Sequence, residues 1–150
     1  MPGYQGHVVG GTLAAGGVWL SLALWLPMYQ PEPVQGVALM AIATLTALFP
    51  DVDTDSKGQR LFYAILVVAD LTLLWFGKYR WAAILGFVAM LPAVGQHRGW
   101  THTWWAMLIV PLPILLLPYC FFGTGVEVLA PYYAAAVIGY FSHLVLDWVL

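Results

Sequence analysis

The amino-acid sequence predicts an all-α protein, a polytopic bundle of about six transmembrane helices. Hydrophobic residues make up 62% of the 150 residues and charged residues only 8%, whereas a soluble domain carries about 25% charged residues. The apolar residues also form runs close to the roughly 20 residues that a helix needs to cross a bilayer. A chain with so few charges cannot cover a surface that faces water, so we expect lipid to surround most of it.

Length and charge exclude several other classes of protein. We expect a single transmembrane domain over residues 1–150, because this length suffices for several spans and no separate soluble domain. Five Lys and Arg residues and a net charge of −2 exclude an electrostatic nucleic-acid surface. The single Cys120 excludes a disulfide framework and a thiolate metal cluster. The N-terminus lacks the basic region of a signal peptide, so we expect the first apolar run to be retained.

Six apolar runs predict the helices, at about residues 8–26, 34–49, 61–76, 81–94, 103–122 and 131–150. The first run stops at Pro27 and the second at Pro50, because proline lacks the N–H that a helix interior requires. The third ends at a tight polar turn that contains Gly77, Lys78 and Arg80.

Glycine and proline also delimit the later helices. The fourth run breaks at Gly95, ahead of a polar segment. Pro111, Pro113 and Pro118 interrupt the fifth run, so we expect this span to be kinked. The sixth run begins near Pro131 and reaches the last residue of the sequence.

Counting the spans assigns each polar motif to one side of the membrane. The segments after the second and fourth spans, and the end of the sixth, return to the side that holds the N-terminus, which we call the N-terminal face. All four histidines fall on this face, with every acidic residue except Glu32, Asp70 and Glu127. This clustering indicates a shared site. Asp70 lies near the middle of the third span, and we expect it to be protonated and hydrogen-bonded outside the site.

His143 and Asp147 stand four residues apart on the predicted sixth helix, so their side chains project from one face, a turn apart. The spacing suits two ligands of one ion, or a histidine oriented by a carboxylate. Burying both beside a membrane is costly unless they are paired or functional. The structural alternative is a His–Asp hydrogen bond that joins two helices.

Three aspartates follow the second span. Asp51, Asp53 and Asp55 alternate after a proline, so an extended segment would point all three the same way. Converging carboxylates repel one another unless a cation lies among them, and we therefore interpret Asp51 and Asp53 as metal ligands. Asp55 or Ser56 is interpreted as the cap of the third helix.

The segment His97-Arg98-Gly99-Trp100-Thr101-His102 places two imidazoles around a glycine. Neutral imidazole is the commonest metal ligand in proteins, and the planar guanidinium of Arg98 suits a phosphate or a carboxylate. The alternative is a polar loop between helices, in which Thr101 or Thr103 caps the fifth helix.

His7 precedes the first predicted span. Its neighbours Gly6, Gly10 and Ala14 form a stripe of small residues that we interpret as a surface for close helix packing. His7 joins the candidate ligands because the other motifs share its face of the membrane.

Together these motifs resemble the YdjM-like family of predicted membrane-bound, metal-dependent hydrolases. The resemblance covers nearly the whole chain and is carried by Gly6-His7, Pro50-Asp51-Val52-Asp53, the segment 97–102, and Ser142-His143 with Asp147. The first family motif usually reads Thr-His, whereas Gly6-His7 stands here. The order of the ligands is also distantly similar to zinc-dependent phospholipase C, which implies a phosphoester substrate.

The residues and the resemblance predict a metal-dependent hydrolase with its site on the N-terminal face. The site would bind one or two divalent ions, of which zinc is the most plausible and manganese or iron the alternatives. The candidate ligands are His7, Asp51, Asp53, His97, His102, His143 and Asp147. Arg98 would hold the anionic group of the substrate, a phosphoester such as a phospholipid. Asp53 would be a catalytic carboxylate if it is not needed as a ligand. The alternative is a non-enzymatic metal-binding protein or a divalent-metal transporter, although a transporter would place its acids nearer the bilayer midplane.

The distribution of basic residues predicts the orientation in a prokaryotic inner membrane. Lys57, Arg60 and Arg98 lie on the N-terminal face, against Lys78 and Arg80 on the opposite one. Under the positive-inside rule the N-terminal face is expected to face the cytoplasm. Membrane lipid is the expected partner, and the oligomeric state is left open.

Overall fold

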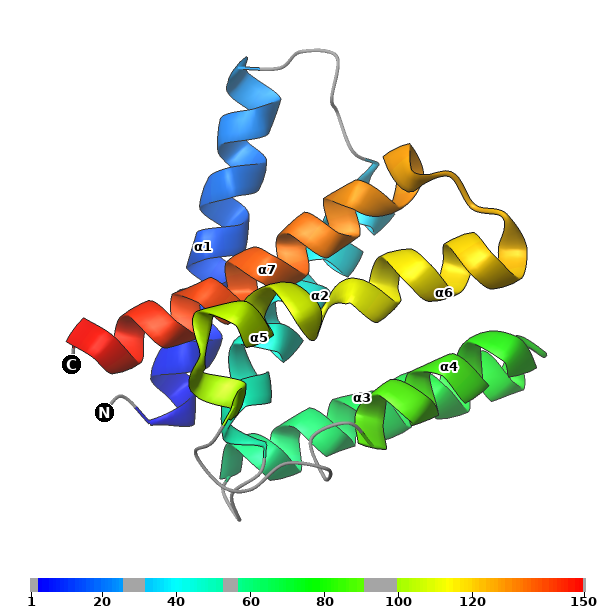
Figure 1. Ribbon diagram of the computed structural model, residues 1–150, viewed down its shortest axis with the longest axis horizontal. Helices are drawn as coiled ribbons and strands as arrows, with labels where there is room; N and C mark the ends of the chain where they lie inside the picture. Colours follow the sequence, from blue (N-terminus) through cyan, green and yellow to red (C-terminus); the bar gives the residue numbers. More distant parts are fainter. Residues whose placement is uncertain (1–2, 26–31, 53–56, 91–99, 150) are drawn as a thin grey trace.

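The computed structural model confirms the all-α class. It describes residues 3–25, 32–52, 57–90 and 100–149, with only the backbone for residues 21–25, and all regular structure in these ranges is helical. The elements are α1 (Tyr4–Trp25), α2 (Pro33–Leu48), η1 (Phe49–Asp51), α3 (Lys57–Trp75), α4 (Tyr79–Met90), η3 (Trp100–His102), α5 (Trp104–Ile109), α6 (Leu112–Phe122) and α7 (Val126–Val149). Figure 1 shows them along the chain.

The helices correspond to the six predicted spans, because α5 and α6 together form the fifth. Within the described ranges, four helical stretches are long and apolar enough to cross a membrane: Pro33–Asp51, Lys57–Trp75, Trp104–Phe122 and Val126–Val149. The helix α4 is shorter, and the end predicted for it near Val94 lies outside the described residues. The helix α1 contains 22 residues.

The fifth span is interrupted at Pro111 as predicted, whereas Pro118, also predicted to interrupt it, lies inside α6. The helix α5 ends at Ile109, and Pro111 precedes α6, so the span is broken where proline cannot donate to the helix ladder. Thr103 is the N-cap of α5, and its side chain accepts a hydrogen bond from the Ala106 N–H, which confirms one of the two predicted caps.

Three helices begin earlier in the chain than the sequence predicted. The helix α1 begins at Tyr4, so His7 lies inside the first helix and not before it. The helix α3 begins at Lys57, and α7 begins at Val126 with Pro131 inside it. A proline near the start of a helix removes only one hydrogen bond there, and the apolar residues before Pro131 extend α7 by a further turn.

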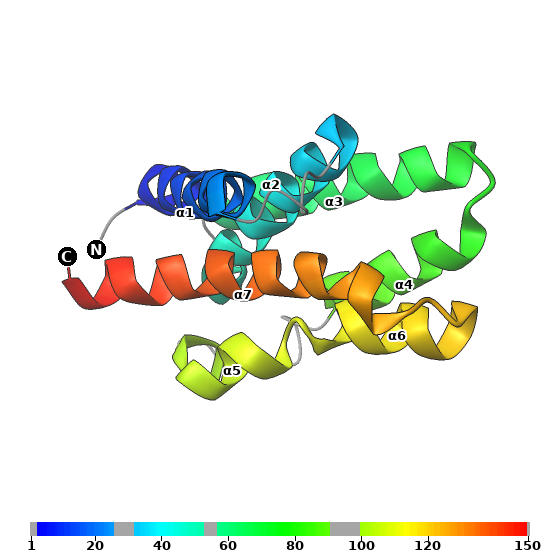
Figure 2. The ribbon, with the colours of Figure 1, turned by 90° about the horizontal axis from the view of Figure 1, so that it is seen from above.

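The helices α1, α2 and α7 pack against one another at the centre of the molecule. The approach is close at two glycines: a Cβ on Gly11 would lie 2.6 Å from the Ala47 Cβ, and a Cβ on Gly139 would collide with the Ala43 carbonyl oxygen. These contacts leave the start of α1 beside the end of α7, near η1 (Figures 1 and 2). Three segments far apart in the sequence therefore meet at one end of the bundle.

The helices α3 and α4 form a hairpin, joined by a turn at Gly77, whose φ of 68° suits glycine. The helix α6 packs on α7, and Figure 2 shows the α5–α6 span running alongside it. Large apolar side chains on the outer side of α3, including Val67, Val68 and Leu71, are more than half exposed. Exposed apolar surface of this kind is expected where a helix faces lipid.

Candidate metal centre

Five of the seven predicted ligands meet at the end of the bundle where α1 starts and α7 ends. They are His7 of α1, Asp51 of η1, His102 of η3, and His143 and Asp147 of α7. The other two predicted ligands and the predicted anion-binding residue, Asp53, His97 and Arg98, lie outside the described residues, as does Asp55.

Four of these side chains form a compact group of donor atoms. One ligand atom from each of Asp51, His102, His143 and Asp147 lies within 4.8 Å of all the others. His102 Nε2 is 3.6 Å from Asp51 Oδ1 and 3.6 Å from Asp147 Oδ2. His143 Nε2 is 3.8 Å and 3.3 Å from the same two oxygens. The group could hold a metal ion.

The spacing of these atoms suits an ion between them. Nitrogen and oxygen atoms bound at 2.0–2.2 Å to a tetrahedral zinc ion lie ~3.3–3.6 Å from one another. The four nitrogen–oxygen separations of 3.3–3.8 Å match this edge length closely. They exceed the roughly 2.7–3.2 Å typical of N–H···O hydrogen bonds.

The imidazole ring of His143 is oriented by a backbone group. Its Nδ1 lies 2.7 Å from the Ala47 carbonyl oxygen of α2. A carbonyl can only accept, so Nδ1 carries the proton and Nε2 of the neutral ring presents a lone pair. That Nε2 atom is buried, points to both aspartates and has no hydrogen-bond partner in the described part of the chain. Buried polar atoms normally have a partner, and an ion would supply one.

His102 is held by the short helix that precedes α5. Its Nδ1 lies 3.2 Å from the hydroxyl of Thr101, and the Thr101 carbonyl accepts a hydrogen bond from the hydroxyl of Tyr140. Thr101 and Tyr140 are both buried. Since Tyr140 stands one turn before His143 on α7, this bond ties the segment of His102 to the helix that carries the other ligands.

His7 approaches the same two carboxylates by their other oxygens. Its Nε2 lies 3.4 Å from Asp147 Oδ1 and 3.8 Å from Asp51 Oδ2. Its ring stacks on that of His143, with ring centroids 3.9 Å apart and planes inclined by 22°. The side chain is 1% exposed, which follows from its position inside α1 against the central helix pair.

The site is sealed on one side and open on the other. His143 is fully buried, whereas the side chains of His102 and Asp51 are 22% and 35% exposed. Two carboxylates this close repel each other in a partly buried place, and a divalent cation would offset both charges. The opening beside Asp51 and His102 is the side from which a substrate could enter.

The sequence did not reveal the groups that position these ligands. The Ala47 carbonyl that orients His143 belongs to an ordinary apolar residue, so no pattern could identify it. Tyr140 could have been found from the sequence, because it precedes His143 by three residues and so lies on the same face of the predicted sixth helix. The hydrogen bond expected for Asp70 is not found at its buried Oδ1, which has no partner within the described ranges.

Residues 1–150 match the model of a protein family described as YdjM inner membrane protein. No curated protein and no solved structure matches the chain. The match covers the whole sequence and confirms the family that the motifs resemble. The chain therefore belongs to the YdjM inner membrane protein family and, with its membrane-spanning helices, is an integral protein of the inner membrane.

Proposed function

We propose that this member of the YdjM inner membrane protein family is a metal-dependent hydrolase that acts on a phosphoester such as a phospholipid. The observation that supports it most strongly is the buried Nε2 of His143. It faces two carboxylates at 3.3 Å and 3.8 Å and has no hydrogen-bond partner among the described residues, while Nδ1 is fixed by a backbone carbonyl.

Zinc fits the donor set best. Two imidazole nitrogens and two carboxylate oxygens, whose four nitrogen–oxygen separations are 3.3–3.8 Å, are ligands that zinc accepts readily. Manganese and iron take the same donors with different preferred geometry, so elemental analysis decides among the three.

Different side chains would have different roles in hydrolysis. A bound divalent ion would supply Lewis acidity and lower the pKa of a coordinated water. Asp51 and Asp147 would hold the ion with His102 and His143. Asp53, which follows Asp51 by two residues, is the candidate general base if it is not a ligand. Arg98 would bind the anionic phosphoester through its planar fork, and His97 is a further candidate ligand.

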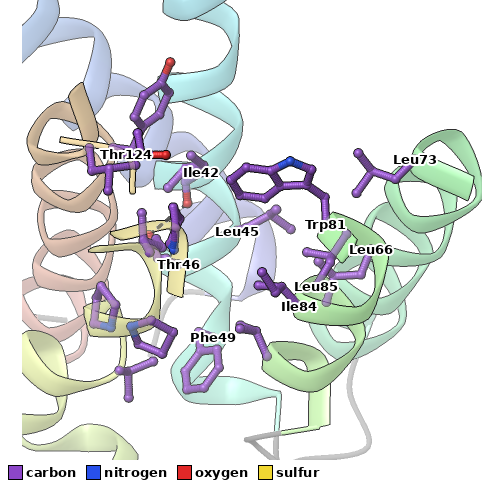
Figure 3. Close-up of a pocket in the computed structure, with 18 of the residues that line it drawn as sticks. Ile42, Leu45, Thr46, Phe49, Leu66, Leu73, Trp81, Ile84, Leu85 and Thr124 are labelled. Carbon is purple, nitrogen blue, oxygen red and sulfur yellow. Dashed lines mark hydrogen bonds between the residues drawn. The ribbon is translucent and has the colours of Figure 1, made fainter. Parts of the chain in front are cut away.

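An apolar cavity supports a lipid as the substrate. The cavity has a volume of about 550 Å³ and is lined mainly by apolar side chains of α2, α3, α4, α6 and α7. Figure 3 shows Leu45 and Phe49 on one wall and Trp81 and Leu85 on the opposite one. Phe49 lines this cavity and stands two residues before Asp51. Apolar space of this size beside a polar site suits the hydrocarbon part of a membrane lipid.

The experiment compares metal content and hydrolysis in purified wild-type protein, Asp147→Ala and the matched control Asp70→Ala. Both variants remove one carboxylate from a helix, but only Asp147 lies in the cluster. We expect Asp147→Ala to weaken metal binding by at least about tenfold and to lose turnover of phosphoesters, and Asp70→Ala to keep both. Wild-type protein without stoichiometric metal would overturn the proposal. Bound metal without turnover of any phospholipid or soluble phosphoester would favour the non-enzymatic metal-binding protein or transporter.

A further inference from the structure

Each of the two aspartates at the centre faces histidines with both of its oxygens. Asp51 presents Oδ1 to His102 and His143, at 3.6 Å and 3.8 Å, and Oδ2 to His7 at 3.8 Å. Asp147 presents Oδ2 to the first two, at 3.6 Å and 3.3 Å, and Oδ1 to His7 at 3.4 Å. The donor atoms therefore fall into two sets that share two carboxylates but no atom.

The stacking of His7 on His143 fixes the spacing of the two sets. The ring centroids lie 3.9 Å apart and the planes are inclined by only 22°. An ion bound to an imidazole lies near the plane of that ring, so two ions on these rings would be separated by about the stacking distance. Paired metal ions in hydrolytic sites lie roughly 3.5–4 Å apart, which is the spacing that these rings provide.

The buried side chain of His7 has few polar contacts in the described part of the chain. The side chain is 1% exposed, and its Nδ1 is buried without a hydrogen-bond partner in the described ranges. Its polar contacts there are those of Nε2 with Asp51 and Asp147. An ion between Nε2 and the two carboxylates would give this buried ring a partner.

We propose that the centre is dinuclear: His7 Nε2, Asp51 Oδ2 and Asp147 Oδ1 bind a second divalent ion, and both carboxylates bridge the pair. This inference rests on the first ion of the proposed function. The first ion takes four ligands from the described residues, which is the closed tetrahedral set. The second takes three and keeps a position for water or for a phosphoester oxygen, as catalytic zinc sites do.

The net charge of a centre with two metal ions also indicates which class of substrate it would bind. Two divalent ions against two carboxylates leave a net charge of +2 at the five described ligands, whereas one ion leaves none. A dinuclear centre thus attracts a phosphoester anion, and two ions can contact both the attacking and the leaving oxygen of the phosphoryl group.

The test is the metal content of purified His7→Ala beside wild type and the control Gln5→Ala, which alters an exposed residue in the same turn of α1. We expect about two ions per chain in wild type and in Gln5→Ala, and about one in His7→Ala. In manganese-loaded wild type we expect the electron paramagnetic resonance spectrum of an exchange-coupled pair, and in His7→Ala that of an isolated ion. The wild-type spectrum answers the question even if His7→Ala does not fold.

One ion per chain in wild type, with an uncoupled manganese spectrum, overturns the dinuclear centre and leaves the proposed hydrolase intact. A coupled pair in a protein that hydrolyses no phosphoester keeps the dinuclear centre and removes the proposed activity. Wild type without any bound ion overturns both the dinuclear centre and the proposed hydrolase. Failure of the dinuclear centre alone is therefore distinguishable from failure of the proposed function.

Discussion

At the scale of single residues, metal binding at this centre depends on which nitrogen of each histidine carries the proton. The Ala47 carbonyl fixes this for His143, because it can accept only from Nδ1. The same helix carries Tyr140, whose hydroxyl donates to the Thr101 carbonyl and so holds the segment of His102 in place. Ligand orientation at this centre therefore comes from buried backbone oxygens on α2 and in η3.

Removing the Tyr140 hydroxyl is expected to affect stability and metal binding together. Tyr140→Phe leaves the buried Thr101 carbonyl without its donor, which costs about 1–2 kcal/mol of unfolding free energy. It also frees the segment of His102, so the affinity for zinc should fall by roughly tenfold. Thermal unfolding and zinc titration in detergent measure both quantities. Tyr133→Phe is the control, since the Tyr133 hydroxyl donates to the Leu108 carbonyl, at 2.9 Å, away from the cluster. Unchanged zinc affinity in Tyr140→Phe would contradict the role of this bond.

The sequence indicated which residues gather at this end of the bundle, but not how their side chains are arranged. Spacing indicated that His143 and Asp147 share a helix face, and span counting indicated that His7, Asp51 and His102 lie at the same end of the bundle. The stacking of His7 on His143 follows from the crossing of α1 and α7. No local pattern encodes such a crossing, because it depends on which small residues of two distant helices meet.

At the scale of helices, close packing brings the ligands together. The helices α2 and α7 approach where Gly139 faces the Ala43 carbonyl, one turn from Ala47 and from His143. Most helix ends lie within a few residues of those predicted from the sequence. The last span was predicted to begin near Pro131, whereas the mostly apolar residues before that proline belong to α7, which begins at Val126.

A methyl group at the α2–α7 crossing is expected to lower both the stability of the protein and its affinity for zinc, although the crossing does not contact the ion. Gly139→Ala places a Cβ against the Ala43 backbone, which cannot move without shifting α2, and should cost about 1–3 kcal/mol. The displaced Ala47 carbonyl would also lose His143, so zinc affinity should fall with stability. In the control Gly86→Ala the new Cβ meets nothing within 4 Å, and the variant should be as stable as wild type or slightly more so. Equal unfolding temperatures and zinc affinities for the two variants would show that the crossing does not position the site.

At the scale of the whole molecule, the candidate metal centre and the apolar cavity both include residues that follow the end of α2. Phe49 lines the cavity, and Asp51 joins the cluster two residues later. The molecule also exposes large apolar side chains on α3 and α6, including Val68, Leu71 and Phe121. A membrane lipid could therefore contact apolar surface and the polar centre together, which a water-soluble substrate would not require.

The side of the membrane that holds the centre is a property of the whole chain. Three basic residues on the N-terminal face against two on the other predict that the centre faces the cytoplasm. A green fluorescent protein fused after Leu150 should then be fluorescent, and alkaline phosphatase fused at the same position should be inactive. Active alkaline phosphatase with a dark fluorescent protein would place the centre on the periplasmic side.

X-ray absorption at the metal edge of purified protein shows directly whether His7, Asp51, His102, His143 and Asp147 bind a divalent ion. For zinc, we expect nitrogen and oxygen neighbours at about 2.0–2.1 Å, with the outer-shell scattering of imidazole. His143→Ala should lose part of that imidazole signal or the metal itself. A protein that carries no stoichiometric metal, or a bound metal without imidazole neighbours, would show that these side chains do not form a metal centre.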